Sequence, residues 1–159
     1  MDHEQNESSP PHILIVDDNR DGADGLSMLF EGWGCRTSAV YNGHEAVGAA
    51  ISMKPDMVVL DICMPRPNGI ETCQRIREQS WAADTVIIGV TGSWIAQEAA
   101  QMNGSFDGVF LKPDEVEPLR GFVNMLQRCK RRKRAGTHGI VAQALRAVAG
   151  RGSNHESSS

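Results

Sequence analysis

Short apolar runs recur along this chain, and a polar residue follows each of them. Runs of about five apolar residues are typical of strands buried on both faces of a parallel sheet, where the alternation of polar and apolar positions disappears. Together with one less apolar segment, these runs predict five strands, at residues 12–16, 35–40, 57–60, 86–90 and 109–111.

Apolar residues at helical spacing occupy the segments between the predicted strands. Leu26 and Phe30 mark the first such segment, Gly32 and Gly34 are suited to end it, and Ile51 belongs to the apolar face of the second. The predicted helices cover residues 21–33, 44–52, 70–79, 95–102 and 114–131. Alternation of five strands with five helices predicts an α/β fold with a parallel sheet, covered on both faces and joined by right-handed crossovers.

Polar side chains with useful chemistry lie directly at the ends of four predicted strands. They are Asp17 and Asp18 after the first strand, Asp61 after the third, Thr91 after the fourth and Lys112 after the fifth. The carboxyl ends of parallel strands meet at one edge of the sheet, where open α/β sheets bind ligands. We therefore expect these five side chains to converge there.

The three carboxylates suggest a metal and a phosphoryl group. Like charges in one cleft oppose each other's ionisation, and a divalent cation removes that penalty. Carboxylate oxygens suit Mg²⁺, which commonly pairs with phosphate. A hydroxyl at Thr91 and an ammonium at Lys112 could hold a phosphoryl group. Asp61 is then the natural nucleophile, because aspartate can form an acyl phosphate.

Chain length and charge distribution limit the kinds of function. The chain of 159 residues supports one domain with an ordinary core, and a second folded output domain would not fit easily. Residues 1–129 hold nine Lys and Arg against nineteen Asp and Glu, a balance of −10, whereas residues 130–159 hold seven against one, a balance of +6. An acidic body argues against nucleic acid as the main partner and is compatible with a bound cation.

Composition divides the chain into three segments. Residues 1–11 are expected to form a flexible leader, residues 12–131 the folded domain, and residues 132–159 a basic C-terminal tail with a short helix at 140–149. Neither a targeting sequence nor a membrane-spanning stretch is present, so we expect a cytoplasmic protein with no membrane partner and no DNA-binding domain.

Four cysteines are spaced without a C-x-x-C pair, so they are expected to be reduced thiols in the core or just beneath the surface. They are Cys35, Cys63, Cys73 and Cys129. Trp94, beside the fourth strand, is either a packing residue or part of a partner surface.

The chain resembles the receiver domains of two-component response regulators over roughly residues 12–130. The resemblance rests on the segments Val16-Asp17-Asp18-Asn19 and Asp61-Ile62-Cys63-Met64-Pro65-Arg66-Pro67-Asn68-Gly69, on Thr91, and on Lys112-Pro113. It implies a flavodoxin-like (βα)5 three-layer sandwich with a five-stranded sheet of order 2-1-3-4-5.

The resemblance also implies a role for each site residue. Asp61 would accept the phosphoryl group, and Mg²⁺ would be held by Asp18, Asp61 and the backbone carbonyl of Cys63, with Asp17 acting mainly through a metal-bound water. Thr91 would move to hydrogen-bond the phosphoryl group. Lys112 would pair with that group, helped by a cis peptide before the following proline.

Some positions depart from the usual receiver pattern. Val109 stands where an aromatic switch residue is usual, and Phe110 should face the opposite side of the strand. Cys63 and Ser93 occupy the two positions that tune dephosphorylation, and neither orients water strongly. A fairly long-lived phosphoryl state is the resulting hypothesis.

The expected protein is a single-domain receiver that accepts a phosphoryl group on Asp61 from a phosphohistidine of a histidine kinase or histidine phosphotransfer protein. It would not be an enzyme beyond self-catalysed transfer and dephosphorylation. It would signal by onward transfer, by binding a downstream protein or by forming a homodimer, with the fourth helix, fifth strand and fifth helix as the contact surface.

Three alternative interpretations stay open. The first is a pseudo-receiver that binds proteins without phosphorylation. The second is an Mg²⁺-dependent aspartate-nucleophile phosphatase, which is disfavoured because Cys63 stands where that class needs a second acid. The third is purely structural, with Asp17 and Asp18 acting only as caps of the first helix.

Overall fold

The computed structural model describes residues 9–112 and 116–132 of the chain. Within them, five parallel strands form one sheet in the order β2-β1-β3-β4-β5, which confirms the predicted fold and strand order. The strands are β1 (His12–Val16), β2 (Arg36–Val40), β3 (Met57–Asp61), β4 (Val86–Thr91) and β5 (Gly108–Leu111).

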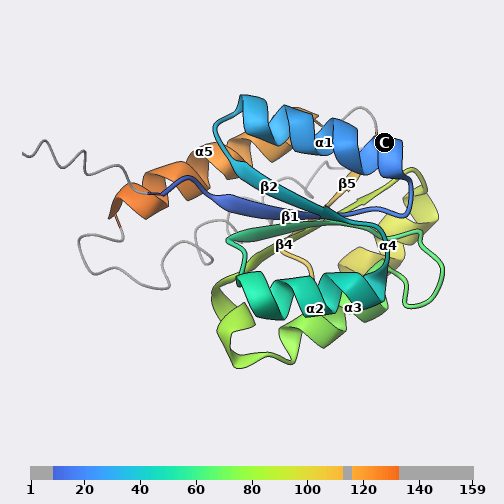
Figure 1. Cartoon of the computed structure of the whole chain (residues 1–159). Coiled ribbons are helices and arrows are strands. Elements are labelled where there is room, and N and C mark those ends of the chain that lie inside the picture. Colours follow the sequence, from blue (N-terminus) through green and yellow to red (C-terminus); the bar gives the residue numbers. More distant parts are fainter. Residues whose placement is uncertain (1–8, 113–115, 133–159) are drawn as a thin grey trace, which may run out of the picture.

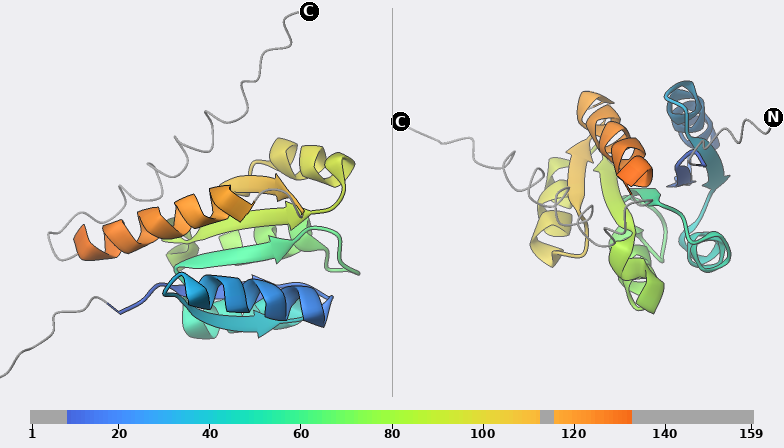
Figure 2. Two further views of the ribbon diagram at one scale, coloured as in Figure 1. Left: turned by 90° about the horizontal axis from the view of Figure 1, so that it is seen from above. Right: turned by 90° about the vertical axis from the view of Figure 1, so that its left-hand side faces the viewer.

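Helices cover the two faces of this sheet (Figure 1). They are α1 (Arg20–Gly32), α2 (Gly43–Met53), α3 (Gly69–Arg77), α4 (Trp94–Asn103) and α5 (Val116–Arg132). The views in Figure 2 show α1 and α5 on one face and α2 and α3 on the other, with α4 beside the edge strand β5. The result is a three-layer α/β sandwich.

Alternating side chains of the central strands form two cores. In β1, Ile13 and Ile15 pack with the helices α1 and α5, whereas Leu14 and Val16 pack with α2 and α3. All four are at most 1% exposed. Because β1 is covered on both faces, every residue of its apolar run is buried, as the sequence pattern predicts, and only His12 at the start of the strand is partly exposed.

Side-chain caps fix where four helices begin. Asn19, Asn42 and Asn68 accept a backbone N–H at the starts of α1, α2 and α3, and Ser93 does the same for α4. Each capping residue lies in the loop that joins the carboxyl end of a strand to the next helix. These starts therefore determine how closely each helix approaches that edge of the sheet.

Several expectations are wrong in detail. A 3-10 helix, η1 (Ser80–Asp84), fills the connection before β4, where no helix was expected. Ile51 is 45% exposed because the contacts of α2 with the sheet are made mainly by the small residues Ala46 and Ala50. Cys63 is exposed rather than buried or subsurface, since it lies in the loop beyond β3.

Parts of the segment predictions lie outside the described residues. These are most of the leader at 1–11, nearly all of the basic tail at 132–159 with its helix at 140–149, the first two residues of the helix expected from 114, and the peptide bond preceding residue 113. Within the described ranges, no helix combines the length and apolar character needed to cross a bilayer.

Candidate functional site

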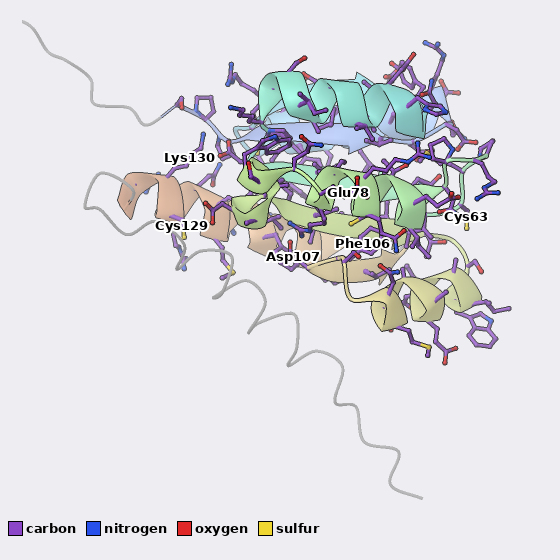
Figure 3. The ribbon with its side chains drawn as sticks, turned by 90° about the horizontal axis from the view of Figure 1, so that it is seen from below. Cys63, Glu78, Phe106, Asp107, Cys129 and Lys130 are labelled. Atoms are coloured by element: carbon purple, nitrogen blue, oxygen red, sulfur yellow. The ribbon has the colours of Figure 1, made fainter. Side chains whose placement is uncertain are left out.

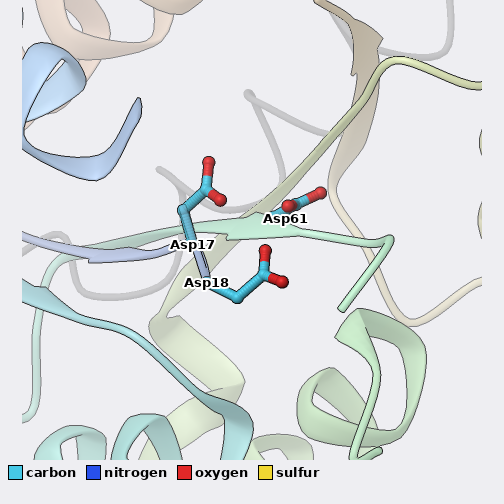
Figure 4. A group of neighbouring side chains, drawn as sticks. All are labelled: Asp17, Asp18 and Asp61. Atoms are coloured by element: carbon cyan, nitrogen blue, oxygen red, sulfur yellow. The ribbon is translucent and has the colours of Figure 1, made fainter. Parts of the chain in front are cut away.

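Three carboxylates meet at the carboxyl edge of the sheet (Figure 4). Asp17 and Asp18 directly follow β1, and Asp61 is the last residue of β3. The two strands pair in register with Val16 opposite Leu60, so the residues just beyond them are neighbours. One carboxylate oxygen from each aspartate lies within 4.8 Å of the other two. The predicted convergence is therefore present in the structure.

Asp17 is held firmly at the base of this cluster. Its side chain is 2% exposed, and its Oδ1 accepts the backbone N–H of Asn19 at 2.9 Å. The side chain of Asn19 in turn caps α1 by accepting the N–H of Gly22. Capping is thus done by Asn19, and the interpretation of Asp17 and Asp18 as mere caps of that helix is wrong.

Lys112 directly follows β5, and its ammonium group lies closer to Asp17 than to Asp61. Its Nζ lies 2.7 Å from Asp17 Oδ2 and 3.9 Å from Asp61 Oδ2. The backbone N–H of Lys112 donates to the carbonyl of Thr91 at 2.8 Å, which fixes the start of its side chain beside β4. One ammonium faces three carboxylates, so the cluster keeps an excess of negative charge.

The surroundings of Asp61 strongly raise the pKa of its carboxyl group. Burial raises the pKa of Asp61 to about 6; the negative charge of Asp17 and a hydrogen bond between the two side chains act in the same direction. Lys112 and the backbone N–H of Cys63, which donates to Asp61 Oδ1 at 3.1 Å, lower the pKa but do not offset burial. A buried carboxylate with little hydration is poised to bind a cation or form a covalent bond.

Thr91 is the last residue of β4, one position beyond Val90, which pairs with Asp61 in the sheet, and it is fully buried. Its Oγ1 accepts the backbone N–H of Ser93 at 3.1 Å and lies 3.3 Å from the Cys63 sulfur. The hydroxyl therefore has partners in both loops that border the site, the loop after β3 and the loop before α4.

The loop after β3 folds back tightly over the strand end. The N–H of Gly69 donates to the carbonyl of Ile62 at 3.0 Å. A Cβ atom at Gly69 would collide with the backbone of Asp61 and Ile62. Glycine here allows α3 to begin directly against the site, and the capping box of Asn68 and Glu71 holds that start.

The donor set at this edge fits a hard divalent cation. The three aspartates offer oxygen atoms alone, within the spacing that one ion can bridge, and Asp18 is exposed so that coordinated water has room. These are the properties expected of an Mg²⁺ site. The backbone carbonyl of Cys63 as a further ligand stays a prediction.

The structure also shows an ion pair that sequence patterns did not indicate. Arg77 and Asp107 form a salt bridge of 2.7 Å between side chains that are 17% and 3% exposed.

Trp94, at the start of α4, is 66% exposed, so its interpretation as a packing residue is wrong. Val109 packs beside Ile62, whereas the ring of Phe110 packs on the other face of the sheet, as predicted for this strand.

Fold and site together define a receiver-type α/β protein with a cluster of three carboxylates at the carboxyl edge of its sheet. Comparison with known families agrees, because the sequence profile "Response regulator receiver domain" matches residues 13–124. The chain therefore belongs to the response regulator receiver domain family.

Two of the curated relatives are named as DNA-binding regulators. The chain is 29% identical to the DNA-binding dual master transcriptional regulator RpaA of Synechocystis, over 82% of this chain and 55% of RpaA. It is 37% identical to the DNA-binding response regulator MtrA of Mycolicibacterium paratuberculosis, over 67% of this chain and 47% of MtrA. The chain thus spans about half the length of these relatives.

Solved structures with the same fold are receiver proteins. One is the response regulator TrrA of Thermotoga maritima in complex with Mg²⁺ and BeF, at 28% identity and a TM-score of 0.66, covering 73% of this chain and 98% of TrrA. Another is the receiver domain of the Francisella response regulator 1452, at 27% identity and a TM-score of 0.64, covering 74% of this chain and 97% of that domain.

Proposed function

We propose that this protein is a phosphorylation-controlled receiver in which Asp61 accepts a phosphoryl group from a phosphohistidine. The observation that carries the proposal is the position of Asp61: nearly buried at the end of β3, among two further carboxylates and within 3.9 Å of the Lys112 ammonium. The donor would be a histidine kinase or a histidine phosphotransfer protein, in the cytoplasm.

Transfer would join one Asp61 Oδ atom to phosphorus. The phosphorus–nitrogen bond of the donor breaks as the new bond forms, and its electron pair returns to the imidazole ring of the donor histidine. Lys112 lies close enough to Asp61 to turn toward the added phosphoryl oxygens. Thr91 can offer them its hydroxyl once it leaves its resting partners.

Asp17, Asp18 and Asp61, with the Cys63 carbonyl, would hold Mg²⁺ in the proposed active form. When bound, the ion would neutralise charge on the carboxylates and on the incoming phosphoryl oxygens. Support comes from the all-oxygen donor set and from the Mg²⁺–BeF complex of TrrA.

The proposed output is a change in protein contacts at α4, β5 and α5. Phosphorylation adds negative charge, and differential contacts with Lys112 and Thr91 shift an equilibrium between two states. A downstream protein, a second copy of the chain, or onward phosphotransfer would then respond. Exposed Trp94 at the start of α4 supports a contact role for this surface. The closeness of the three carboxylates to one another and to the Lys112 ammonium disfavours the pseudo-receiver alternative.

Acetyl phosphate with Mg²⁺, followed by intact-mass measurement, tests the proposal. We expect one phosphoryl adduct on the wild type and none on Asp61→Asn. The control Asp84→Asn changes an aspartate of η1, away from the sheet edge, and should keep the adduct. No adduct on the wild type with any small phosphodonor or phosphohistidine protein would favour the pseudo-receiver, and sustained hydrolysis of unrelated phosphate esters would favour the phosphatase.

A further inference from the structure

The side chain of Cys63 takes no part in the proposed transfer of the phosphoryl group to Asp61, yet it contacts Thr91, the residue that must move. The thiol sulfur lies 3.3 Å from Thr91 Oγ1, a distance suited to a hydrogen bond involving sulfur, and either atom can be the donor. Cys63 itself is exposed at the rim of the site, whereas Thr91 is fully buried.

The partners of the Thr91 hydroxyl leave it little freedom. In the loop before α4, the backbone N–H of Ser93 donates to Oγ1 at 3.1 Å. In the loop after β3, the Cys63 sulfur lies within hydrogen-bond distance of the same oxygen. A threonine hydroxyl offers one donor and two acceptor positions. Turning Thr91 toward a phosphoryl group on Asp61 therefore breaks the contact with sulfur and releases the N–H of Ser93.

Loss of the hydrogen bond from the Ser93 N–H to Thr91 would also affect the start of α4. The Ser93 side chain caps α4 by accepting the N–H of Ala96 at 3.3 Å, and the next residue is exposed Trp94. Few side chains hold α4 to the body of the protein, since Ala100 is its buried residue and Gln97 ties it to the carbonyl of Val109. Thr91 thus connects Asp61 with the first turn of a lightly packed helix.

We propose that the Cys63 thiol is a positioning residue that holds Thr91 in its resting orientation and so opposes activation of the receiver. The proposal rests on the proposed phosphorylation of Asp61. Sulfur is a weak hydrogen-bond partner, which makes the restraint small enough to be overcome by a phosphoryl group. The role belongs to the side chain of Cys63 and is separate from that of its backbone.

The first test needs no phosphate. In the 159-residue chain with labelled threonine methyl groups, three-bond couplings report the χ1 rotamer of Thr91. We expect a single rotamer in the wild type, rotamer averaging in Cys63→Ala, and recovery of the wild-type pattern in Cys63→Ser, whose hydroxyl can bond Thr91. Cys129→Ala is the matched control, because Cys129 lies at the far end of the molecule (Figure 3) and should leave Thr91 unchanged.

The second test measures the affinity for beryllofluoride in the presence of Mg²⁺. Removing one weak hydrogen bond from the resting state should tighten binding about two- to fivefold in Cys63→Ala. The same change made in a Thr91→Ala background should have no effect, since the residue through which Cys63 acts is gone. A merely structural role of Cys63 would give the same effect in both backgrounds.

The outcomes separate the two proposals. An unchanged Thr91 rotamer in Cys63→Ala, or equal beryllofluoride affinities of Cys63→Ala and the wild type, overturns the role of Cys63 while phosphorylation of Asp61 stands. A wild type that takes neither beryllofluoride nor a phosphoryl group overturns the proposed function, and the role of Cys63 in switching falls with it.

Discussion

Replacing Asp61 by asparagine should make the metal-free protein more stable at neutral pH. Burial raises the pKa of Asp61 from 3.8 in the unfolded chain to about 6 in the folded protein, so folding favours the protonated, neutral form. Below about pH 4, ionisation of Asp61 does not reduce the unfolding free energy. As the pH rises from about 4 to about 6, the unfolding free energy falls, because the unfolded chain loses this proton more readily than the folded protein. Asparagine has nearly the same shape and never ionises, so it avoids this loss.

The magnitude follows from the two pKa values. A difference of about two pKa units corresponds to about 3 kcal/mol of unfolding free energy once the pH is well above 6. The same relation leaves a difference of about 1 kcal/mol at pH 4.5. Because the Asp61 side chain is only 10% exposed, solvent screening removes little of this effect.

Urea denaturation of wild type and Asp61→Asn in EDTA, between pH 4.5 and 7.5, measures these differences directly. Asp18→Asn is the matched control: Asp18 is exposed, so its neutralisation should change stability by less than about 0.5 kcal/mol. Equal unfolding free energies of wild type and Asp61→Asn at pH 7.5 would refute the reasoning, and so would a difference that does not shrink toward pH 4.5.

Three further predictions concern the frame and chemistry of the site. Arg77→Ala should lower the unfolding free energy by about 3–5 kcal/mol, because it removes the cation that pairs with the buried carboxylate of Asp107, whereas exposed Arg75→Ala should change little in the same urea titration. Gly69→Ala should slow phosphorylation of Asp61 by acetyl phosphate, because the new Cβ displaces the strand end, and unchanged kinetics would contradict this. The wild-type phosphoprotein should persist for minutes or longer in Mg²⁺, and complete loss within seconds by intact mass would exclude the long-lived state.

Much of the fold could be predicted because the signals are local. Strands buried on both faces need continuous apolar runs, and those runs located four of the five strands. The site followed from topology, since parallel strands place the residues after them at one edge. Asp17, Asp18 and Asp61 are therefore brought together whatever the detailed packing.

The missed features depend on contacts between distant segments. The pairing of Arg77 with Asp107 spans 30 residues of sequence, and its guanidinium also donates to the carbonyls of Ala82 and Thr85 around η1. No local pattern marks such a partner. The contact of Cys63 with Thr91 spans 28 residues and depends on how one loop lies over its neighbour.

The arrangement of charge explains why this edge of the sheet should bind ligands. Lys112 makes its short contact with Asp17, at 2.7 Å, and leaves Asp61 at 3.9 Å with a pKa of about 6. The resting site is therefore held together although one of its carboxylates is poorly stabilised. A cation that neutralises Asp61 removes an unfavourable interaction that folding has already imposed, so binding gains free energy without any rearrangement of β1 or β3. Affinity for a divalent ion and instability of the metal-free form at neutral pH are, on this view, two consequences of the same buried carboxylate.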